Sequence, residues 1–133
     1  MQIAQMPQPE QIKQLMEGPD DTPVVMVNLL KFKESADGAN AGMSGGESYM
    51  KYGAEMRKFV ESKGGRFIWS GRADSMVIGE SDVDWDVIAL VEYPSRKAFV
   101  EIASSSHVAT IGEDRKMGLE GQWLIAATEA GVL

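Results

Sequence analysis

One stretch near the N-terminus constrains the fold more than any other, because it is apolar on both of its faces. Residues 23–33 read PVVMVNLLKFK, with a proline at the start followed by β-branched residues. The run is too short between its breakers to favour a helix, so it predicts a strand. An antiparallel strand with one face in water alternates apolar and polar residues, and this one does not. The sheet that contains it must therefore be covered on both sides.

The rest of the chain supplies further elements in a definite order. Pro9–Glu17 predicts a short helix that Gly18 ends. A long amphipathic helix begins with the capping pair Ser44 and Glu47 and ends at Gly64. The patterns then predict an extended segment over 66–79, a polar link over 80–84, a strand over 85–93, helical stretches beginning near 96 and 106, and a last strand over 119–128.

This order of strand, helix, strand, strand, helix and strand is the split βαβ pattern. It predicts an α+β, ferredoxin-like fold with a four-stranded antiparallel sheet and helices on one face. We expect one domain over residues 1–133, with the short helix 9–17 ahead of a core at 22–128. The helices cover only one face, and each Val, Leu or Ile left in water forgoes about 1.5–3 kcal/mol. We therefore expect a homodimer in which two copies pack their sheets face to face.

Composition excludes several classes of function. The absence of cysteine excludes a disulfide framework, a thiolate nucleophile and a cysteine-ligated metal, and a single histidine excludes a histidine-rich metal site. We expect no metal and no cofactor. The net charge of −7 repels phosphate backbones, so no nucleic-acid partner is expected. No apolar run approaches the roughly 18 residues of a membrane span and no secretory signal is evident, so we expect a cytoplasmic protein without a membrane partner.

Four short blocks resemble a known family. They are Val27–Phe32, Trp85-Asp86, Glu92–Arg96, and Arg115 followed by the sequence GLEGQ at 118–122. These blocks resemble the family catalogued as domain of unknown function 1330. That family is similar to the dimeric α/β-barrel superfamily, which includes cofactor-free antibiotic-biosynthesis monooxygenases, muconolactone isomerases and haem-degrading enzymes. The resemblance spans roughly residues 22–128 and implies the ferredoxin-like fold and the dimeric α/β barrel, with little indication of the chemistry.

Two polar residues are candidates for chemistry. His107 is the only histidine, and its side chain is the one expected to titrate near neutral pH. It is a candidate general base or, as in haem-degrading relatives, a haem ligand; alternatively it is a surface histidine beside a helix start. Asn28 is the single polar residue within 24–30. A buried amide without partners costs about 1–3 kcal/mol, so Asn28 must bond to a ligand, a neighbouring loop or the dimer interface.

Aromatic and basic residues complete the candidate site. Tyr49 and Tyr52 lie on the inward stripe of the long helix and face the sheet that carries Trp69 and Trp123. Together they predict either an aromatic-walled cavity for a flat hydrophobic ligand or ordinary core packing. Arg115 is the best of three candidate arginines for binding a substrate carboxylate, because it belongs to a family block; the alternative is that it pairs with an Asp or Glu. The other two arginines are Arg66 and Arg72.

The preferred hypothesis is a small-molecule-binding protein that acts on a small flat apolar or aromatic compound. If it is an enzyme, it is a cofactor-independent monooxygenase or isomerase. His107 is then the acid/base candidate, Asn28, Tyr49 and Tyr52 orient the substrate, and Arg115 holds an anionic group. The alternatives are a non-catalytic ligand-binding or interaction module and, less favoured, a haem-binding or haem-degrading protein.

Overall fold

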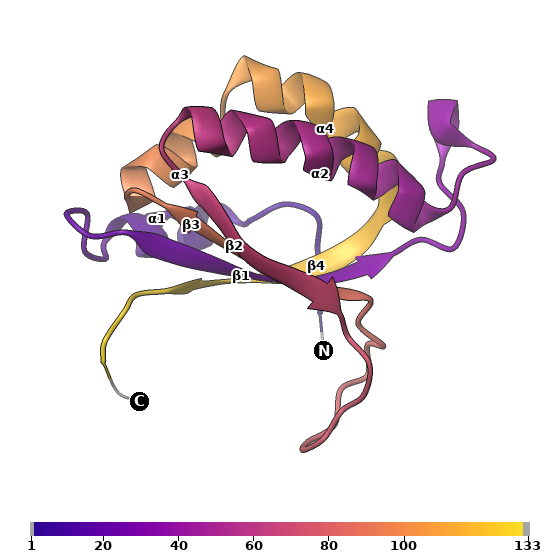
Figure 1. Cartoon of the computed structure of the whole chain (residues 1–133), viewed down its shortest axis with the longest axis horizontal. Coiled ribbons are helices and arrows are strands. Elements are labelled where there is room, and N and C mark those ends of the chain that lie inside the picture. Colours follow the sequence, from indigo (N-terminus) through magenta and orange to yellow (C-terminus); the bar gives the residue numbers. More distant parts are fainter. Residues whose placement is uncertain (1, 132–133) are drawn as a thin grey trace.

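A four-stranded antiparallel sheet carries its main helices on one face (Figure 1). The structure, a computed structural model, describes residues 2–131. The strands are β1 (Val24–Phe32), β2 (Arg66–Arg72), β3 (Val87–Tyr93) and β4 (Leu119–Ala127), in the spatial order β2-β3-β1-β4. The helices are α1 (Pro9–Met16), η1 (Gly38–Asn40), α2 (Gly45–Ser62), α3 (Arg96–Ala103) and α4 (Ser106–Gly118). The predicted ferredoxin-like α+β fold is confirmed. Among the described residues no helix is long and apolar enough to cross a bilayer.

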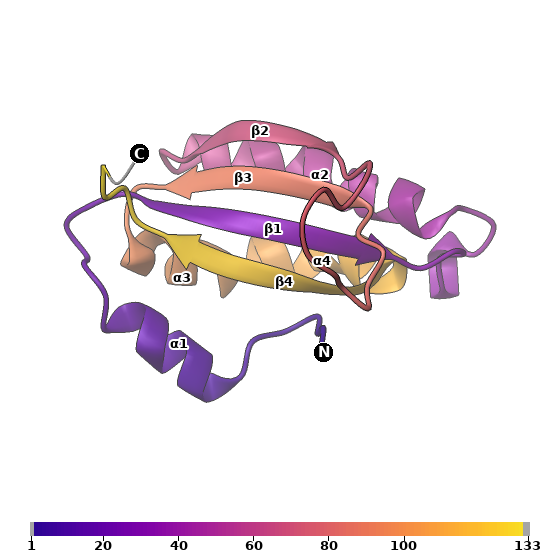
Figure 2. The same cartoon turned by 90° about the horizontal axis from the view of Figure 1, so that it is seen from below.

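The core lies between the sheet and the helices. Met26 of β1 pairs with Val91 of β3, and both side chains are buried against Met56 and Val60 of α2. Met56 and Val60 are four residues apart, so they lie on the same face of α2 and pack on the same part of the sheet. In Figure 2 the short α1 lies beside the edge formed by β4, and its Leu15 packs against this core.

The opposite face of the sheet is also apolar. The row next to Met26 contains Val27, which pairs with Leu90 of β3 and Ile125 of β4. Adjacent rows of a pleated sheet point to opposite faces, so these side chains point away from the helices. Ile125 is 50% exposed and Trp69 of β2, which pairs with Leu90, is 55% exposed. The sheet is therefore apolar on both faces, as the sequence of residues 23–33 predicted. We call the side away from the helices the open face.

A bulge in β2 determines which face Trp69 occupies. Phe67 pairs with Val91 in a row that faces the helices, but the register shifts after it, and Trp69 pairs with Leu90. The extra residue, Ile68, moves Trp69 onto the open face, where its ring lies over Gly71.

The connection between β2 and β3 differs from the prediction. The extended segment predicted over 66–79 ends at Arg72, and the strand predicted from Trp85 begins at Val87. Pairing stops one residue beyond Arg72, where the Ala73 N–H donates to the Asp86 carbonyl. The residues that would pair with 75–78 are rich in Asp, which disfavours strands. Residues 73–86 instead form a loop on the open-face side of the sheet (Figure 1).

Two glycines allow the start of α2 to approach the end of α4. A Cβ atom at Gly45 would lie 2.0 Å from the Lys33 carbonyl oxygen, and one at Gly118 would lie 2.3 Å from the Gly45 carbonyl oxygen. Both are distances that side chains do not occupy. This contact positions the first turns of α2 against the last turn of α4, which carry several of the candidate residues.

We predict that Gly45→Ala destabilises the protein by about 1–3 kcal/mol, because the backbones must separate to admit the methyl group. Gly53→Ala is the matched control. It lies inside the same helix with no atom within 4 Å of the added Cβ, so it should stabilise by about 0.5–1 kcal/mol. Urea unfolding measures both. Equal effects of the two substitutions would contradict the role given to Gly45.

Candidate functional site

Five polar or phenolic side chains converge on the helix side of β1 and β4. We call them the tyrosine–arginine cluster: Asn28 of β1, Tyr49 and Tyr52 of α2, Arg115 of α4 and Gln122 of β4. Asn28 and Gln122 pair with Leu124 and Leu30, so both belong to rows on the helix side. Leu124 shares that side and is 42% exposed, so solvent reaches this part of the interior at the β4 edge.

Asn28 is held by the backbone of its own sheet. Its Nδ2 donates to the carbonyls of Met26 at 3.2 Å and Ala89 at 3.3 Å. Its Oδ1 accepts from Gln122 Nε2 at 3.4 Å. The amide therefore already has protein partners in place of the neighbouring loop considered from the sequence, and its orientation is fixed by the strands around it.

Arg115 has only neutral partners. NH2 donates to Gln122 Oε1 at 3.0 Å and to the Gln5 carbonyl, and NH1 contacts Met6 Sδ at 3.9 Å. No carboxylate of residues 2–131 forms an ion pair with it. The alternative that Arg115 pairs with an acidic neighbour is therefore not what the structure shows. Arg66, by contrast, does pair with an acid, its Nε lying 3.0 Å from Glu92 Oε1.

The two tyrosines form a connected aromatic pair. Their ring centroids are 5.3 Å apart, and the Tyr49 ring lies 5.2 Å from that of Phe32. Burial raises the pKa of Tyr49, with a further increase from Tyr52, while the positive charge of Arg115 lowers it in part. Burial likewise raises the pKa of Tyr52, again opposed by Arg115. Both phenols are protonated at neutral pH and close enough to Arg115 to respond to its charge.

The hydroxyl groups of these tyrosines have no hydrogen-bond partner within residues 2–131. Neither oxygen is sealed from solvent, since Thr22 Oγ1 is the one fully buried side-chain oxygen or nitrogen without a partner in that range. The cluster thus contains two phenol donors that the protein itself does not use.

The predicted aromatic-walled cavity does not form. Trp123 pairs with Leu29, in a row on the open face, and Trp69 reaches the same face through the β2 bulge. Trp123 contacts Trp85, with ring centroids 5.1 Å apart, and its Nε1 donates to the Gln2 carbonyl at 2.8 Å. The sheet therefore separates both tryptophans from Tyr49 and Tyr52.

His107 also lies apart from the cluster. Its exposed ring packs on Phe59, with ring centroids 4.5 Å apart, in the first turn of α4. Arg115 follows eight residues later on the same helix, which corresponds to about 12 Å along the axis. The structure does not bring His107 to the other candidate residues. Within the described range, no three His, Asp or Glu side chains are grouped so that they could hold a metal ion.

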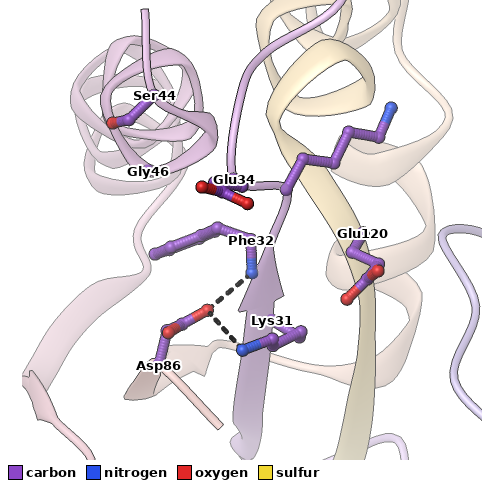
Figure 3. A pocket seen from close by; sticks show the side chains of 8 residues that line it. Lys31, Phe32, Glu34, Ser44, Gly46, Asp86 and Glu120 are labelled. Carbon is purple, nitrogen blue, oxygen red and sulfur yellow. Dashed lines mark hydrogen bonds and ion pairs between the residues drawn. The ribbon is translucent and has the colours of Figure 1, made fainter. Parts of the chain in front are cut away.

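Two surface hollows border the cluster, and none of the predicted site residues lines either of them. The first, about 590 Å³, lies at the end of β1 (Figure 3). There Asp86 accepts from the Phe32 N–H at 2.8 Å and pairs with Lys31 at 3.7 Å. Phe32 separates this hollow from Tyr49. The second is lined by residues that include Gln5 and Lys116.

Gln122 was missed from the sequence although it connects Asn28 to Arg115. Two signals could have found it: Gln122 ends the family block GLEGQ at 118–122, and it is a polar residue directly before the apolar run 123–127. Phe32 was likewise not singled out, because a phenylalanine at the end of an apolar run is unremarkable before its contact with Tyr49 is seen.

Comparison with known proteins defines the fold more than the activity. No family model matches the sequence, and no curated protein matches it. A protein of unknown function from Rhodopseudomonas palustris is 28% identical, with 97% of this chain and 98% of that chain covered and a TM-score of 0.86. A dabb family protein with a ferredoxin-like fold from Mesorhizobium loti is 12% identical over 82% of this chain and 98% of that chain, with a TM-score of 0.54.

SnoaB, a cofactor-independent oxygenase from Streptomyces nogalater, has the same fold. It is 14% identical, with 86% of this chain and 100% of that chain covered and a TM-score of 0.50. These structures show that the chain has the ferredoxin-like fold. The first likeness extends over almost the whole of both chains.

We predict that all three tyrosines of the chain ionise late in the folded protein. Burial also raises the pKa of Tyr93, the third. A group whose pKa is raised by folding stabilises the fold fully below its unfolded pKa, near 10, and that stability is lost as pH rises above it. Ultraviolet titration should show tyrosinate appearing near pH 10 in denaturant and only at higher pH without it. Coincident titration curves would contradict the burial assigned to the phenols.

Proposed function

We propose that this protein binds a small, flat, largely apolar molecule that carries an oxygen atom able to accept hydrogen bonds. The observation that supports the proposal is the pair of unpartnered phenol hydroxyls of Tyr49 and Tyr52 beside the guanidinium of Arg115. The aromatic rings supply apolar contact surface, and the hydroxyls donate the hydrogen bonds that orient the ligand. Access is from the β4 edge, beside Leu124.

The chemistry of the cluster is that of hydrogen-bond donors. Burial keeps Tyr49 and Tyr52 protonated at neutral pH, so they donate, and Arg115 is permanently cationic. Preorganised donors of this kind favour an oxygen that carries or develops negative charge, such as that of an enolate or phenolate. No residue of the cluster is a ready base, and His107 lies about 12 Å away along α4. Binding is therefore the function that the geometry supports best.

Cofactor-independent oxygenation or isomerisation is the second candidate. SnoaB, which shares the fold, is a cofactor-independent oxygenase. The donors of the cluster would stabilise an enolate or phenolate oxygen formed on a bound substrate. In that case the substrate must be acidic enough to lose a proton to water or to a distant group. Turnover of a bound compound separates an enzyme from a non-catalytic binding module.

The resemblance to the family catalogued as domain of unknown function 1330 also points to the tyrosine–arginine cluster as the binding site. Its blocks contain Asn28, Arg115 and Gln122, three of the five residues of the cluster. We propose that the chain is a divergent relative of that family.

We predict that Tyr49→Phe/Tyr52→Phe weakens the binding of aromatic ketones and phenols by about tenfold. Two lost hydrogen bonds of about 0.5–1.5 kcal/mol each account for that loss, while the apolar contacts remain. Chemical-shift titration with acetophenone and phenol is the measurement, with shifts expected in β1, α2 and β4. Ser62→Ala, which removes an exposed hydroxyl at the far end of α2, is the control. Absence of binding by the wild type, or equal binding by the double variant, would refute the site.

We further propose that two copies associate through their open faces. The face formed by Val27, Leu90, Ile125 and Trp69 is apolar and uncovered by any helix. It is bordered by the ion pair of Arg66 with Glu92, as expected for a polar rim. The same face on a second copy is the simplest complementary surface, because a twofold axis brings identical patches together.

We predict that Ile125→Lys converts the protein from dimer to monomer at micromolar concentration. A lysine at this half-exposed position places a charge in the interface without disturbing the core. Met50→Lys is the control, since Met50 is 60% exposed on α2, away from the sheet. Light scattering on a sizing column gives the mass. A wild type that is already monomeric would end the dimer proposal and leave the binding proposal standing.

A further inference from the structure

We infer that Arg115 is the binding site of a carboxylate, so that the molecule bound at the tyrosine–arginine cluster is an aromatic or similarly flat organic anion. This inference rests on the function proposed above and specifies the class of ligand. It follows from the partners of Arg115, from its place beside two free phenols, and from the donors it leaves unused.

Arg115 is one of three arginines within residues 2–131 that form no ion pair; the others are Arg72 and Arg96, and Arg96 donates to three neutral oxygens. Twenty Asp and Glu residues outnumber thirteen Lys and Arg, so acidic partners are plentiful. Arg57 pairs with Glu61 at 2.7 Å and Arg66 with Glu92 at 3.0 Å. The acid next to Arg115 in sequence, Asp114, is bound elsewhere.

Asp114 turns away toward the start of α2. Its Oδ1 accepts from Asn40 Nδ2 at 2.7 Å and lies 3.9 Å from Lys51 Nζ. Its carbonyl accepts from the hydroxyl of Ser48, which is fully buried, at 2.8 Å. These contacts hold the carboxylate on the α2 side of α4, so it does not neutralise the neighbouring guanidinium.

The partners that Arg115 does have leave donors for a ligand. Gln122 and Gln5 supply neutral oxygens to NH2, and NH1 contacts only the sulfur of Met6, a weak acceptor. Nε donates to no residue within 2–131. A carboxylate would replace the weak contact with charge-assisted hydrogen bonds, which are about twice as strong as neutral ones.

The position of Arg115 relative to the tyrosines completes the site. Gly118, three residues after Arg115 on α4, packs against the backbone of Tyr49, whose nitrogen would lie 2.9 Å from a Cβ added at Gly118. The charge of Arg115 acts on both Tyr49 and Tyr52, in agreement with this proximity. Gln122 Oε1 accepts a hydrogen bond from the guanidinium, and Gln122 Nε2 donates to Asn28 Oδ1, so the amide of Gln122 orients Arg115. An aromatic carboxylate would place its anionic end on Arg115 and its ring against the tyrosine pair.

The test compares sodium benzoate with benzamide, which has the same shape and no charge. Isothermal titration calorimetry on the full chain should show benzoate binding about tenfold more tightly, as expected for one charge-assisted contact. Arg115→Gln should remove this preference while benzamide still binds. Arg57→Gln, an exposed arginine paired with Glu61, is the control and should retain it.

The outcomes separate the two proposals. Equal binding of benzoate and benzamide to the wild type, or a preference that survives Arg115→Gln, overturns the carboxylate site and leaves the binding function intact. If neither benzoate nor benzamide binds to the wild type, the carboxylate site and the binding function are both overturned. If Arg115→Gln does not fold, Arg115→Lys is used instead. Lysine keeps the charge but cannot form the forked contact, so the preference should fall severalfold, and an unchanged preference overturns the inference.

Discussion

The antiparallel pairing of β1 between β3 and β4 places each cross-strand row on one face of the sheet or the other. Met26 and Val91 point to the helices, and the next row, with Val27 and Leu90, points away from them. Both rows are apolar, but the helices cover only one of the two faces of the sheet. Each fully buried side chain of this size contributes about 1.5–3 kcal/mol, which makes an uncovered second face costly. The proposed association of two copies follows from this constraint.

The same rows determine where polar chemistry is possible. Asn28 and Gln122 interrupt the apolar helix side near β4, where Leu124 remains partly exposed. The close approach of Gly45 and Gly118 brings the start of α2 to the end of α4, and with it Tyr49 to the neighbourhood of Arg115. The candidate site is thus a result of helix packing at one end of the sheet. It contains donors and a cation, and it has no acidic residue of its own.

The elements with strong local signals could be predicted from the sequence. The run at 23–33 forms β1, and Ser44 caps α2 by accepting the Glu47 N–H at 3.1 Å. The predicted fold followed from the order of such elements. The end of β2 could not be placed, because the apolar residues 76–78 resemble a strand but have no partner to pair with.

The site was predicted in part, for a related reason. Asn28, Tyr49, Tyr52 and Arg115 were chosen from local pattern, and the structure gathers them on one side of the sheet. Trp69 and Trp123 were assigned to the same cavity and lie on the other side. The contact of Gln122 with Asn28 joins residues 94 positions apart, and periodicity within one segment carries no information about such a pair.

The bulge at Ile68 has a consequence for how β2 tolerates change. Replacing one side chain of β2 by another changes the contacts of that residue alone and leaves the register of the strand unchanged. Pairing the same residues without the bulge would instead place Ile68 opposite Leu90, turn the indole of Trp69 inward, against the helices, and move Ser70 outward. This edge of the sheet is therefore permissive toward changes of residue type and strict about register.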